Sequence, residues 1–241
     1  MADTHKEWLK ELETASKAKQ KSFIDSISSK LGRPRPMEKP AHPFRGAPVF
    51  WRSFEWSEEE RIERFSANFK AAGGHVARLA SYDDAKQFIV DKAAEMSAQY
   101  IIRQGQPELE AMNLEAAMPD AHISVWNTNQ EENWRARAAE ADFGVVVADY
   151  AVAYTGSITV LSAANKGRSV SLLPTVLFAI IPLKRLKTRL GEALINFDQA
   201  GRENLPAGIH FISGPSRSAD IENDLTIGVH GPGVVYALFV G

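Results

Sequence analysis

The chain has no cysteine among its 241 residues. This absence excludes a disulfide framework, a thiolate nucleophile, a cysteine-ligated zinc ion and an ordinary iron–sulfur cluster in this chain. If the protein takes part in redox chemistry, the electron carriers must therefore lie elsewhere. The residues themselves leave any other cofactor unknown.

The chain also lacks a strong net charge and a long apolar segment. Its formal net charge of −2 gives no field that would collect DNA or anionic lipid, so nucleic acid is disfavoured as a partner. The longest apolar run, Val170–Leu183, contains Pro174 and Pro182 and falls short of the roughly 20 residues of a membrane-spanning helix. The N-terminal region has no apolar core of the kind found in signal peptides. We therefore expect a cytoplasmic protein without a membrane span.

Several well-known site patterns are missing as well. There is no Gly-x-Gly-x-x-Gly, Walker or Gly-x-Ser-x-Gly pattern, and no histidine pair with the spacing of His-Glu-x-x-His. We expect no metal site. Most of the histidines are interpreted as structural or exposed, namely His5, His42, His75, His122 and His210.

The N-terminal fifth of the chain has the pattern of an arm. Residues 4–31 predict one amphipathic helix, because apolar side chains recur at three- and four-residue multiples, at Trp8, Leu12, Phe23, Ile27 and Leu31. Prolines between residues 34 and 48 then favour an extended strap. We expect residues 1–50 to form this helix and strap and residues 51–241 to form an α/β domain. The arm would dock either on its own domain or on another subunit, so a homo-oligomer through the arm stays open.

From Ser57 to Glu140, helical patterns alternate with short apolar runs. Ser57 and Glu60 form a capping box at the start of a helix that ends at Gly73-Gly74, and Pro107 suits the first turn of a helix that runs to Met118. We expect strands at residues 75–79, 100–103 and 122–126. This alternation is typical of parallel strands covered by helices.

Beyond Phe143 the pattern changes to β-branched runs separated by turns. We expect strands at residues 145–148, 152–154, 158–161, 170–173 and 176–181, a hairpin turn at residues 165–168, and a basic helix at residues 183–197. The expected fold class is α/β, with a mostly parallel sheet and an antiparallel element joined to it.

The segment Gly208–Gly241 is the strongest candidate for a functional site. Two apolar runs, Ile209–Ile212 and Val234–Val240, enclose about twenty residues rich in polar side chains, whereas a usual connection has roughly 4–6. Gly214 would follow a parallel strand at its carboxyl end, where α/β proteins bind ligands. Ser216 and Ser218 offer hydroxyl groups there, and Arg217 offers a bidentate donor for a carboxylate or phosphate.

Two further residues of this segment suit proton transfer. His230 lies in a glycine-rich setting, histidine is a common general acid or base in enzymes, and Asp220 could orient it. We therefore take His230 and Asp220 as candidate catalytic residues. The alternative is structural: Asp220 caps a turn and pairs with Arg217, and His230 bonds a backbone carbonyl. Ser216, Asp220 and His230 are also triad residue types, but a triad is defined by geometry that a sequence does not contain.

A second candidate lies at Thr155, Gly156 and Ser157, between two apolar runs. Consecutive backbone amides in such a turn can form a small anion-binding nest, with two hydroxyl groups added. The alternative interpretation is a tight glycine turn that only joins two strands. The sequence favours neither of these interpretations.

Three segments carry a family resemblance: GPSRSADIENDLTIGVHGPG at residues 214–233, NKGRSVSLLP at residues 165–174, and Ala-x-Thr-Gly-Ser at residues 153–157. In these three segments the chain resembles the lactate utilization protein C family (LutC/YkgG), which has a LUD domain. The resemblance covers roughly residues 60–241. It implies a three-layer α/β/α fold similar to the sugar-isomerase and CoA-transferase group, which includes the formyltetrahydrofolate cyclo-ligases.

The same resemblance implies a function. It implies a component of a system that oxidises L-lactate to pyruvate, working with two partner subunits that carry iron–sulfur clusters and binding a small anionic ligand. One residue departs from the family pattern, since many members have a glutamate where this chain has Tyr154. Covalent catalysis by a carboxylate in this loop is therefore not expected. The fold also admits an autonomous enzyme that acts on a nucleotide, folate or acyl-CoA substrate.

Overall fold

The structure is a computed structural model that describes residues 2–36, 38, 54–219 and 224–241, and side chains from residue 6 onward. The chain divides into two compact units, Met1–Arg52 and Ser53–Gly241. Each unit is described by itself below. The prolines of the expected strap beyond residue 38, and Asp220, lie outside the described residues.

The first unit contains the helix that the N-terminal pattern predicts, α1 (Ala2–Lys30). Its charged residues form local pairs such as Lys17 with Glu13, one turn apart. Its apolar side chains stay exposed within this unit, among them Leu9, Leu12, Phe23 and Ile27. No helix in the described part of the chain has the length and apolar character that crossing a membrane requires.

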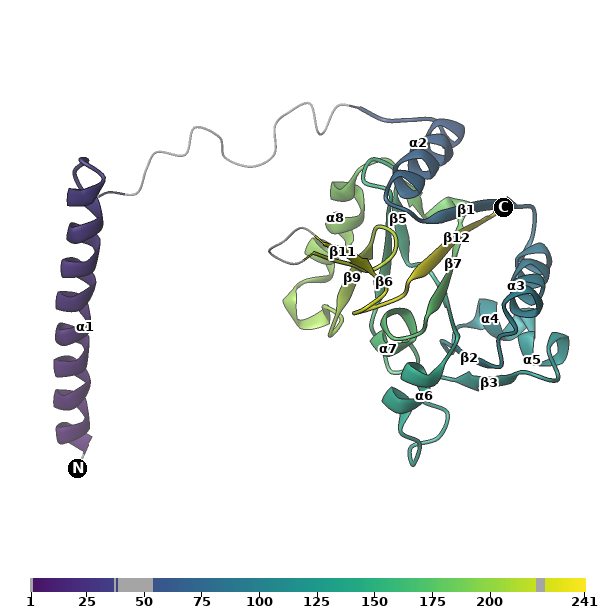
Figure 1. The fold of residues 1–241 in the computed structure, drawn as a ribbon, viewed down its shortest axis with the longest axis horizontal. Helices are drawn as coiled ribbons and strands as arrows, with labels where there is room; N and C mark the ends of the chain where they lie inside the picture. Colours follow the sequence, from purple (N-terminus) through teal and green to yellow (C-terminus); the bar gives the residue numbers. More distant parts are fainter. Residues whose placement is uncertain (1, 37, 39–53, 220–223) are drawn as a thin grey trace. The chain divides into compact units, whose positions relative to one another are not determined.

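The second unit is built on a six-stranded sheet in which every neighbouring pair is parallel. The strand order is β1-β12-β7-β4-β2-β3. The strands are β1 (His75–Leu79), β2 (Tyr100–Arg103), β3 (His122–Val125), β4 (Phe143–Val147), β7 (Val176–Pro182) and β12 (Val234–Val240). Figure 1 shows helices on both sides of this sheet.

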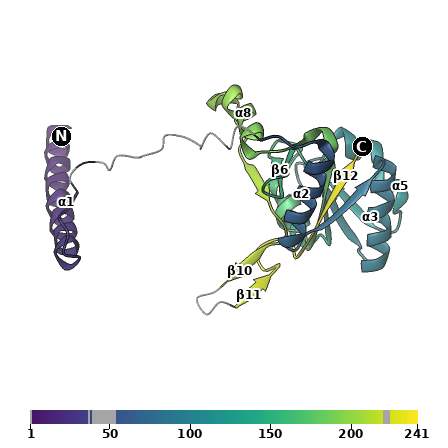
Figure 2. The same cartoon turned by 90° about the horizontal axis from the view of Figure 1, so that it is seen from above.

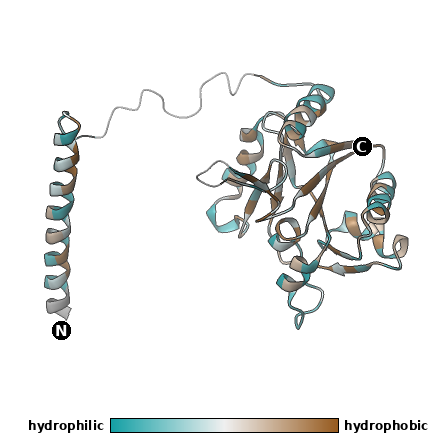
Figure 3. Cartoon of the chain, in the orientation of Figure 1, coloured by the Kyte–Doolittle hydropathy of each residue, from teal (hydrophilic) through white to brown (hydrophobic). Residues whose placement is uncertain are grey.

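The two faces of the sheet bury alternate residues of the same strands. In β7, Phe178 and Ile180 belong to one hydrophobic cluster, and Leu177, Ala179 and Ile181 belong to the other. This period of two is dictated by the pleat of a strand, which directs successive side chains to opposite faces. Figure 3 shows these central strands as mostly hydrophobic, as expected of a parallel sheet covered on both faces.

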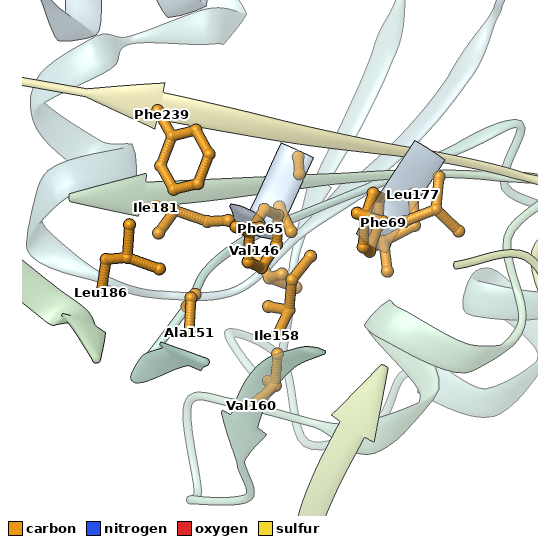
Figure 4. Close-up of a cluster of buried hydrophobic side chains, with 14 of the residues drawn as sticks. Phe65, Phe69, Val146, Ala151, Ile158, Val160, Leu177, Ile181, Leu186 and Phe239 are labelled. Atoms are coloured by element: carbon orange, nitrogen blue, oxygen red, sulfur yellow. The ribbon is translucent and has the colours of Figure 1, made fainter. Parts of the chain in front are cut away.

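One face of the sheet is covered by α3 (Tyr82–Met96), α4 (Pro107–Met112) and α5 (Leu114–Ala117). The other is covered by α2 (Glu58–Ala71), α6 (Trp134–Glu140) and α7 (Arg168–Leu172). Figure 4 shows Phe65 and Phe69 of α2 against Leu177 and Phe239 of the sheet. The hydroxyl of Ser57 accepts the amide of Glu60, so α2 begins at the cap that the sequence predicts.

A smaller four-stranded sheet, in the order β8-β5-β6-β9, packs on the α2 side. Its strands are β5 (Tyr150–Val152), β6 (Ser157–Leu161), β8 (Leu186–Lys187) and β9 (Ile209–Ile212). The pairs β5–β6 and β6–β9 are antiparallel, which is the antiparallel element expected from the sequence. The remaining elements are η2 (Leu183–Arg185), α8 (Leu190–Ala200), η3 (Arg202–Asn204), and a ribbon of β10 (Arg217–Ala219) and β11 (Leu225–Ile227).

Several local predictions are wrong. Residues 170–173 are not a strand, because α7 covers residues 168–172. An antiparallel bridge between Ala163 and Lys166 closes a tight turn here, but residues 165–168 lead from β6 into a helix and do not join two of the strands expected from the sequence. The basic helix expected at residues 183–197 is replaced by η2, β8 and then α8 from Leu190. The helix expected to run from Pro107 to Met118 is broken at Asn113, whose φ of 49° is left-handed.

Candidate functional site

The predicted closing segment begins with a sharp turn against helix α2. Gly214 follows β9 with a φ of +112°, in the left-handed region that favours glycine. A side-chain carbon at this position would lie 2.9 Å from the carbonyl oxygen of Ala72, the C-terminal cap of α2. The close approach of two backbones explains the glycine. It also fixes the following residues beside the end of α2.

The middle of this segment forms a ribbon. The amide of Ser216 donates to the carbonyl of Pro232 at 2.9 Å, and the amide of Gly228 donates to the carbonyl of Ser216 at 3.0 Å. These bonds close the base of the ribbon β10–β11, which carries Arg217 and Ser218, and Figure 2 shows the ribbon extending from the sheets. The polar residues between the two apolar runs therefore form part of a small separate element, the ribbon β10–β11.

A cavity of about 330 Å³ lies at the base of the ribbon. Its wall is formed by Ser171, Leu172, Phe211, Ile212, Ser213, Gly214, Pro215, Ser216, His230, Gly231, Pro232 and Val235. Three of the predicted site residues, Gly214, Ser216 and His230, are thus brought together. Thr155, Gly156, Ser157, Arg217 and Ser218 are not part of this wall.

The cavity lies at the amino ends of the parallel strands β7 and β12, next to Leu172 and Pro232. We expected Gly214 at the carboxyl end of a parallel strand, and this is wrong. The reason is that β9 does not join the parallel sheet but pairs antiparallel with β6. The general rule for ligand sites in parallel α/β sheets therefore does not apply to this cavity.

The Thr-Gly-Ser turn lies directly behind the cavity. Gly156 has a φ of +58°, and a side-chain carbon there would come within 2.8 Å of the Phe69 amide nitrogen. Asn68 of α2 donates from Nδ2 to the carbonyls of Ala153 and Tyr154, both at 3.0 Å. The hydroxyls of Ser157 and Ser213 lie 2.7 Å apart, so the two predicted segments meet at this point.

The backbone of this turn is partly occupied already. The amide of Gly156 donates to the carbonyl of Ala153 at 3.3 Å, so it is not free to form the predicted nest. Thr155 is exposed, whereas Ser157 is buried. Tyr154, the residue that departs from the family pattern, is also exposed and stacks on Trp56 with a ring-centre distance of 6.2 Å. The turn thus contacts Asn68 of α2 through its carbonyls and Trp56 through the ring of Tyr154.

Arg217 contacts helix α2 and not the cavity. Its Nη2 donates to the carbonyl of Ala72 at 2.5 Å, with Gly73 beneath the guanidinium. The positive charge of Arg217 interacts favourably with the negative end of the α2 dipole, and its hydrogen bond satisfies a carbonyl at the end of the helix. Binding of an anion by Arg217 would compete with this contact.

His230 is exposed at the rim of the cavity. Its imidazole forms no hydrogen bond with any residue that the structure describes. The proposed pairing with Asp220 concerns a residue outside the described ranges. His230 therefore has access to a ligand in the cavity, and no residue within the described ranges orients its imidazole.

The carboxyl ends of the parallel strands carry a second polar cluster that the sequence analysis missed. Asp149, just beyond β4, pairs with Lys166 at 2.5 and 2.6 Å, and both side chains are largely buried. Arg185 donates to the carbonyl of Ala148 at 2.8 Å and pairs with Glu108 at 2.7 Å. The available signal was a charged residue immediately after a buried strand, at the edge where such sheets bind ligands.

Two buried glutamine side chains, Gln104 and Gln106, also lie at this edge of the sheet, just after β2. Gln106 is bonded through its side chain to both the amide and the carbonyl of Val147. Gln104 is fully buried, and its Oε1 has no partner among the described residues. In the same part of the chain, no group of three or more His, Cys, Asp or Glu residues is placed to hold a metal ion.

Comparison with known proteins identifies the family. The model of the LUD domain matches residues 62–240, which is most of the second unit. The chain belongs to the LUD-domain family. The resemblance inferred from the three sequence segments is thereby confirmed.

Named relatives match along most of their length. The chain is 34% identical to lactate utilization protein C of Halalkalibacterium halodurans, over 89% of this chain and 94% of that protein. It is 30% identical to lactate utilization protein C of Bacillus subtilis, over 88% and 92% of the two chains, and 30% identical to YkgG of Escherichia coli, over 87% and 93%.

A solved structure supports the fold. A DUF162 family protein from Deinococcus radiodurans, at 20% sequence identity, superposes with a TM-score of 0.58. The match covers 78% of this chain and all of that protein. The expected α/β fold, with a mostly parallel sheet, helices around it and an N-terminal helix, is confirmed.

Proposed function

We propose that this chain is a component of an L-lactate utilization system that oxidises L-lactate to pyruvate. The observation that carries this proposal is the match to relatives named lactate utilization protein C over about nine tenths of both chains. Because the chain has no cysteine, it would be the subunit without iron–sulfur clusters, and its partners would carry them. A cytoplasmic location belongs to the same proposal and is tested by cell fractionation.

Within this system the chain would bind a small anionic ligand at the cavity beside Gly214. Ser216 and His230 line this cavity, and Ser157 reaches its wall through Ser213. Hydroxyl groups and an imidazole can donate hydrogen bonds to a carboxylate, and the histidine can also exchange a proton near neutral pH. Thr155 and Ser218 lie outside the wall of this cavity, and Arg217 would reach a ligand only by releasing its hydrogen bond to the Ala72 carbonyl.

The test of the role is genetic. A strain that has no other lactate oxidase should lose growth on L-lactate when the gene is deleted, and the wild-type gene should restore it. Normal growth of the deletion strain would contradict the proposal. Affinity purification of the full chain from lactate-grown cells should recover iron–sulfur proteins, and a variant that begins near Phe54 shows whether the arm is needed for this association.

A second candidate is an autonomous enzyme acting on a nucleotide, folate or acyl-CoA substrate. The polar edge with Asp149, Lys166 and Arg185 favours it, because the carboxyl ends of parallel strands are the usual ligand site in α/β folds. Purified protein tested alone against such substrates separates the two candidates. Turnover without any partner, abolished by Lys166→Met, would favour the enzyme.

The N-terminal arm would contribute an interface with a second copy. The first half of α1 has an acidic excess, with Asp3, Glu7, Glu11 and Glu13 against Lys6 and Lys10, and the second half has a basic excess, with Lys17, Lys19, Lys21 and Lys30 against Asp25. An antiparallel pair of α1 helices sets each acidic half beside a basic half and covers the exposed apolar side chains. Light scattering of the full chain should give a dimer mass, and removal of residues 1–50 should give a monomer mass. A monomeric full chain would exclude this interface.

A further inference from the structure

Three polar side chains converge at the start of β9, at the opposite end of this strand from the Gly214 cavity. They are Ser162, which follows β6, Arg168, the first residue of α7, and His210 of β9. A side-chain carbon built on Gly208 would lie 2.9 Å from both Ser162 Oγ and His210 Nε2 and 3.1 Å from Arg168 Cδ. The missing side chain of Gly208 thus marks the point where the three residues meet.

The polar atoms at this point are unsatisfied. Ser162 Oγ and His210 Nε2 are both buried, and neither forms a hydrogen bond with another described residue. The guanidinium of Arg168 likewise forms no hydrogen bond or ion pair in the described part of the chain. A buried polar atom without a partner costs about 1–3 kcal/mol, so two of them side by side indicate a group that is bound between them.

The hydrogen-bond donors of these three residues and the positive charge of Arg168 favour an anionic ligand. The hydroxyl and the guanidinium donate hydrogen bonds, a neutral imidazole donates from Nε2 in one of its two tautomers, and Arg168 adds a permanent positive charge. The nearby carboxylate of Asp149, which accepts the amide of Leu161 next to Ser162, is already neutralised by Lys166. Burial, together with the charge of Arg168, lowers the pKa of His210, so this histidine is neutral at physiological pH without a ligand.

We propose that Ser162, Arg168 and His210 form a binding site for the carboxylate group of a small organic acid. A planar carboxylate presents two oxygens, which match the guanidinium on one side and the hydroxyl and imidazole on the other. Arg168 is the exposed member of the group, so the ligand enters from its side. This site is separate from the Gly214 cavity and does not depend on the function proposed for it.

The site is tested on the full chain by NMR titration of the histidine ring C2–H signals with sodium acetate. Sodium chloride at equal ionic strength is the control, and His210→Gln and His230→Gln assign the signals. Acetate should shift the His210 signal saturably and raise the pKa of His210 by about half a unit or more, because the bound anion favours the protonated ring. A His210 signal that responds equally to acetate and chloride overturns the proposal.

Variants separate binding from folding. Arg168→Gln should weaken acetate binding by about tenfold or more, since it removes a charge-assisted hydrogen bond. Gly208→Ala should abolish binding, because its methyl group would press on Ser162 Oγ and His210 Nε2 and displace them, and its melting curve shows whether the fold persists. Acetate affinity that is unchanged in Arg168→Gln overturns the site, and saturation by phosphate at equal affinity overturns the assignment to carboxylates. The His230 signal reports the Gly214 cavity independently, so the two sites can fail separately.

Discussion

The hydroxyl of Ser157 lies 2.7 Å from the hydroxyl of Ser213, and this bond joins two loops that are 56 residues apart in the chain. Both loops also contact the C-terminal half of α2, at Asn68, Phe69 and Ala72. The cavity beside Gly214 is therefore held by three elements that are distant in sequence. Its shape depends on contacts that can be removed one at a time.

The serine pair itself provides the first prediction. Ser157→Ala should lower the free energy of unfolding by about 1 kcal/mol, the net value of a typical hydrogen bond. Ser213→Ala should cost a similar amount, because it leaves the buried hydroxyl of Ser157 without this partner. Urea denaturation of the two single variants and the double variant gives their coupling. If the two effects are strictly additive, the pair does not contribute as a bond.

The glycine of the Thr-Gly-Ser turn provides the second. Gly156→Ala should destabilise the protein by about 2–4 kcal/mol, because alanine is strained at positive φ and its methyl group meets the backbone of Phe69. The matched control is Gly191→Ala in α8, where a side-chain carbon meets nothing within 4 Å. That variant should be neutral or slightly more stable, since alanine favours helices. Equal thermal unfolding of the two variants would contradict the packing described for the turn.

Arg217 separates a structural role from a binding role. Arg217→Ala should lower stability by about 0.5–1 kcal/mol without any ligand, because the C-terminus of α2 loses a charge and a donor. Arg217→Lys keeps the charge and should recover part of this loss. If the alanine variant unfolds like the wild type and loses only ligand binding, the contact with Ala72 is not formed in solution.

The lowered pKa of His210 gives a pH dependence with a definite sign. The folded state holds the neutral imidazole more tightly than the unfolded chain does, because burial and Arg168 disfavour its charged form. The unfolded chain therefore binds the proton more readily, and this residue makes the protein less stable as the pH falls through the ordinary histidine range. His210→Gln should flatten the stability profile between about pH 7 and pH 5. A wild-type profile that becomes more stable in this interval, by an amount lost in His210→Gln, would show the opposite shift.

Much of the fold follows from local signals in the sequence. The cap of α2 at Ser57 and the strands at residues 75–79 and 100–103 were predictable, because each combines a periodic apolar pattern with a clear boundary. The error at residues 170–173 has a physical cause. A short apolar run fits a strand and a helix equally well, and here Val170 is buried in the hydrophobic cluster on the α2 side of the sheet as part of α7, while Leu173 is exposed.

The candidate site was only partly predictable for a similar reason. The sequence segments around Gly214 and Gly156 predict both turns correctly, because a turn with positive φ favours glycine and is therefore visible in the sequence. The sequence contains no comparable signal for the pairing partner of β9, so the prediction that Gly214 lies at the carboxyl end of a parallel strand is wrong. The convergence of Ser162, Arg168 and His210 on Gly208 is likewise a property of tertiary structure alone.

The central claim, that this chain serves L-lactate oxidation through the cavity beside Gly214, is tested most directly by measuring pyruvate formation. Extracts of a deletion strain without other lactate oxidases are supplied with L-lactate and with purified wild-type chain or a Ser216→Ala/His230→Ala variant that is shown to fold. The wild-type chain should restore pyruvate formation and the variant should not. Pyruvate formation at the same rate without the chain would contradict its role, and full restoration by the variant would contradict the site.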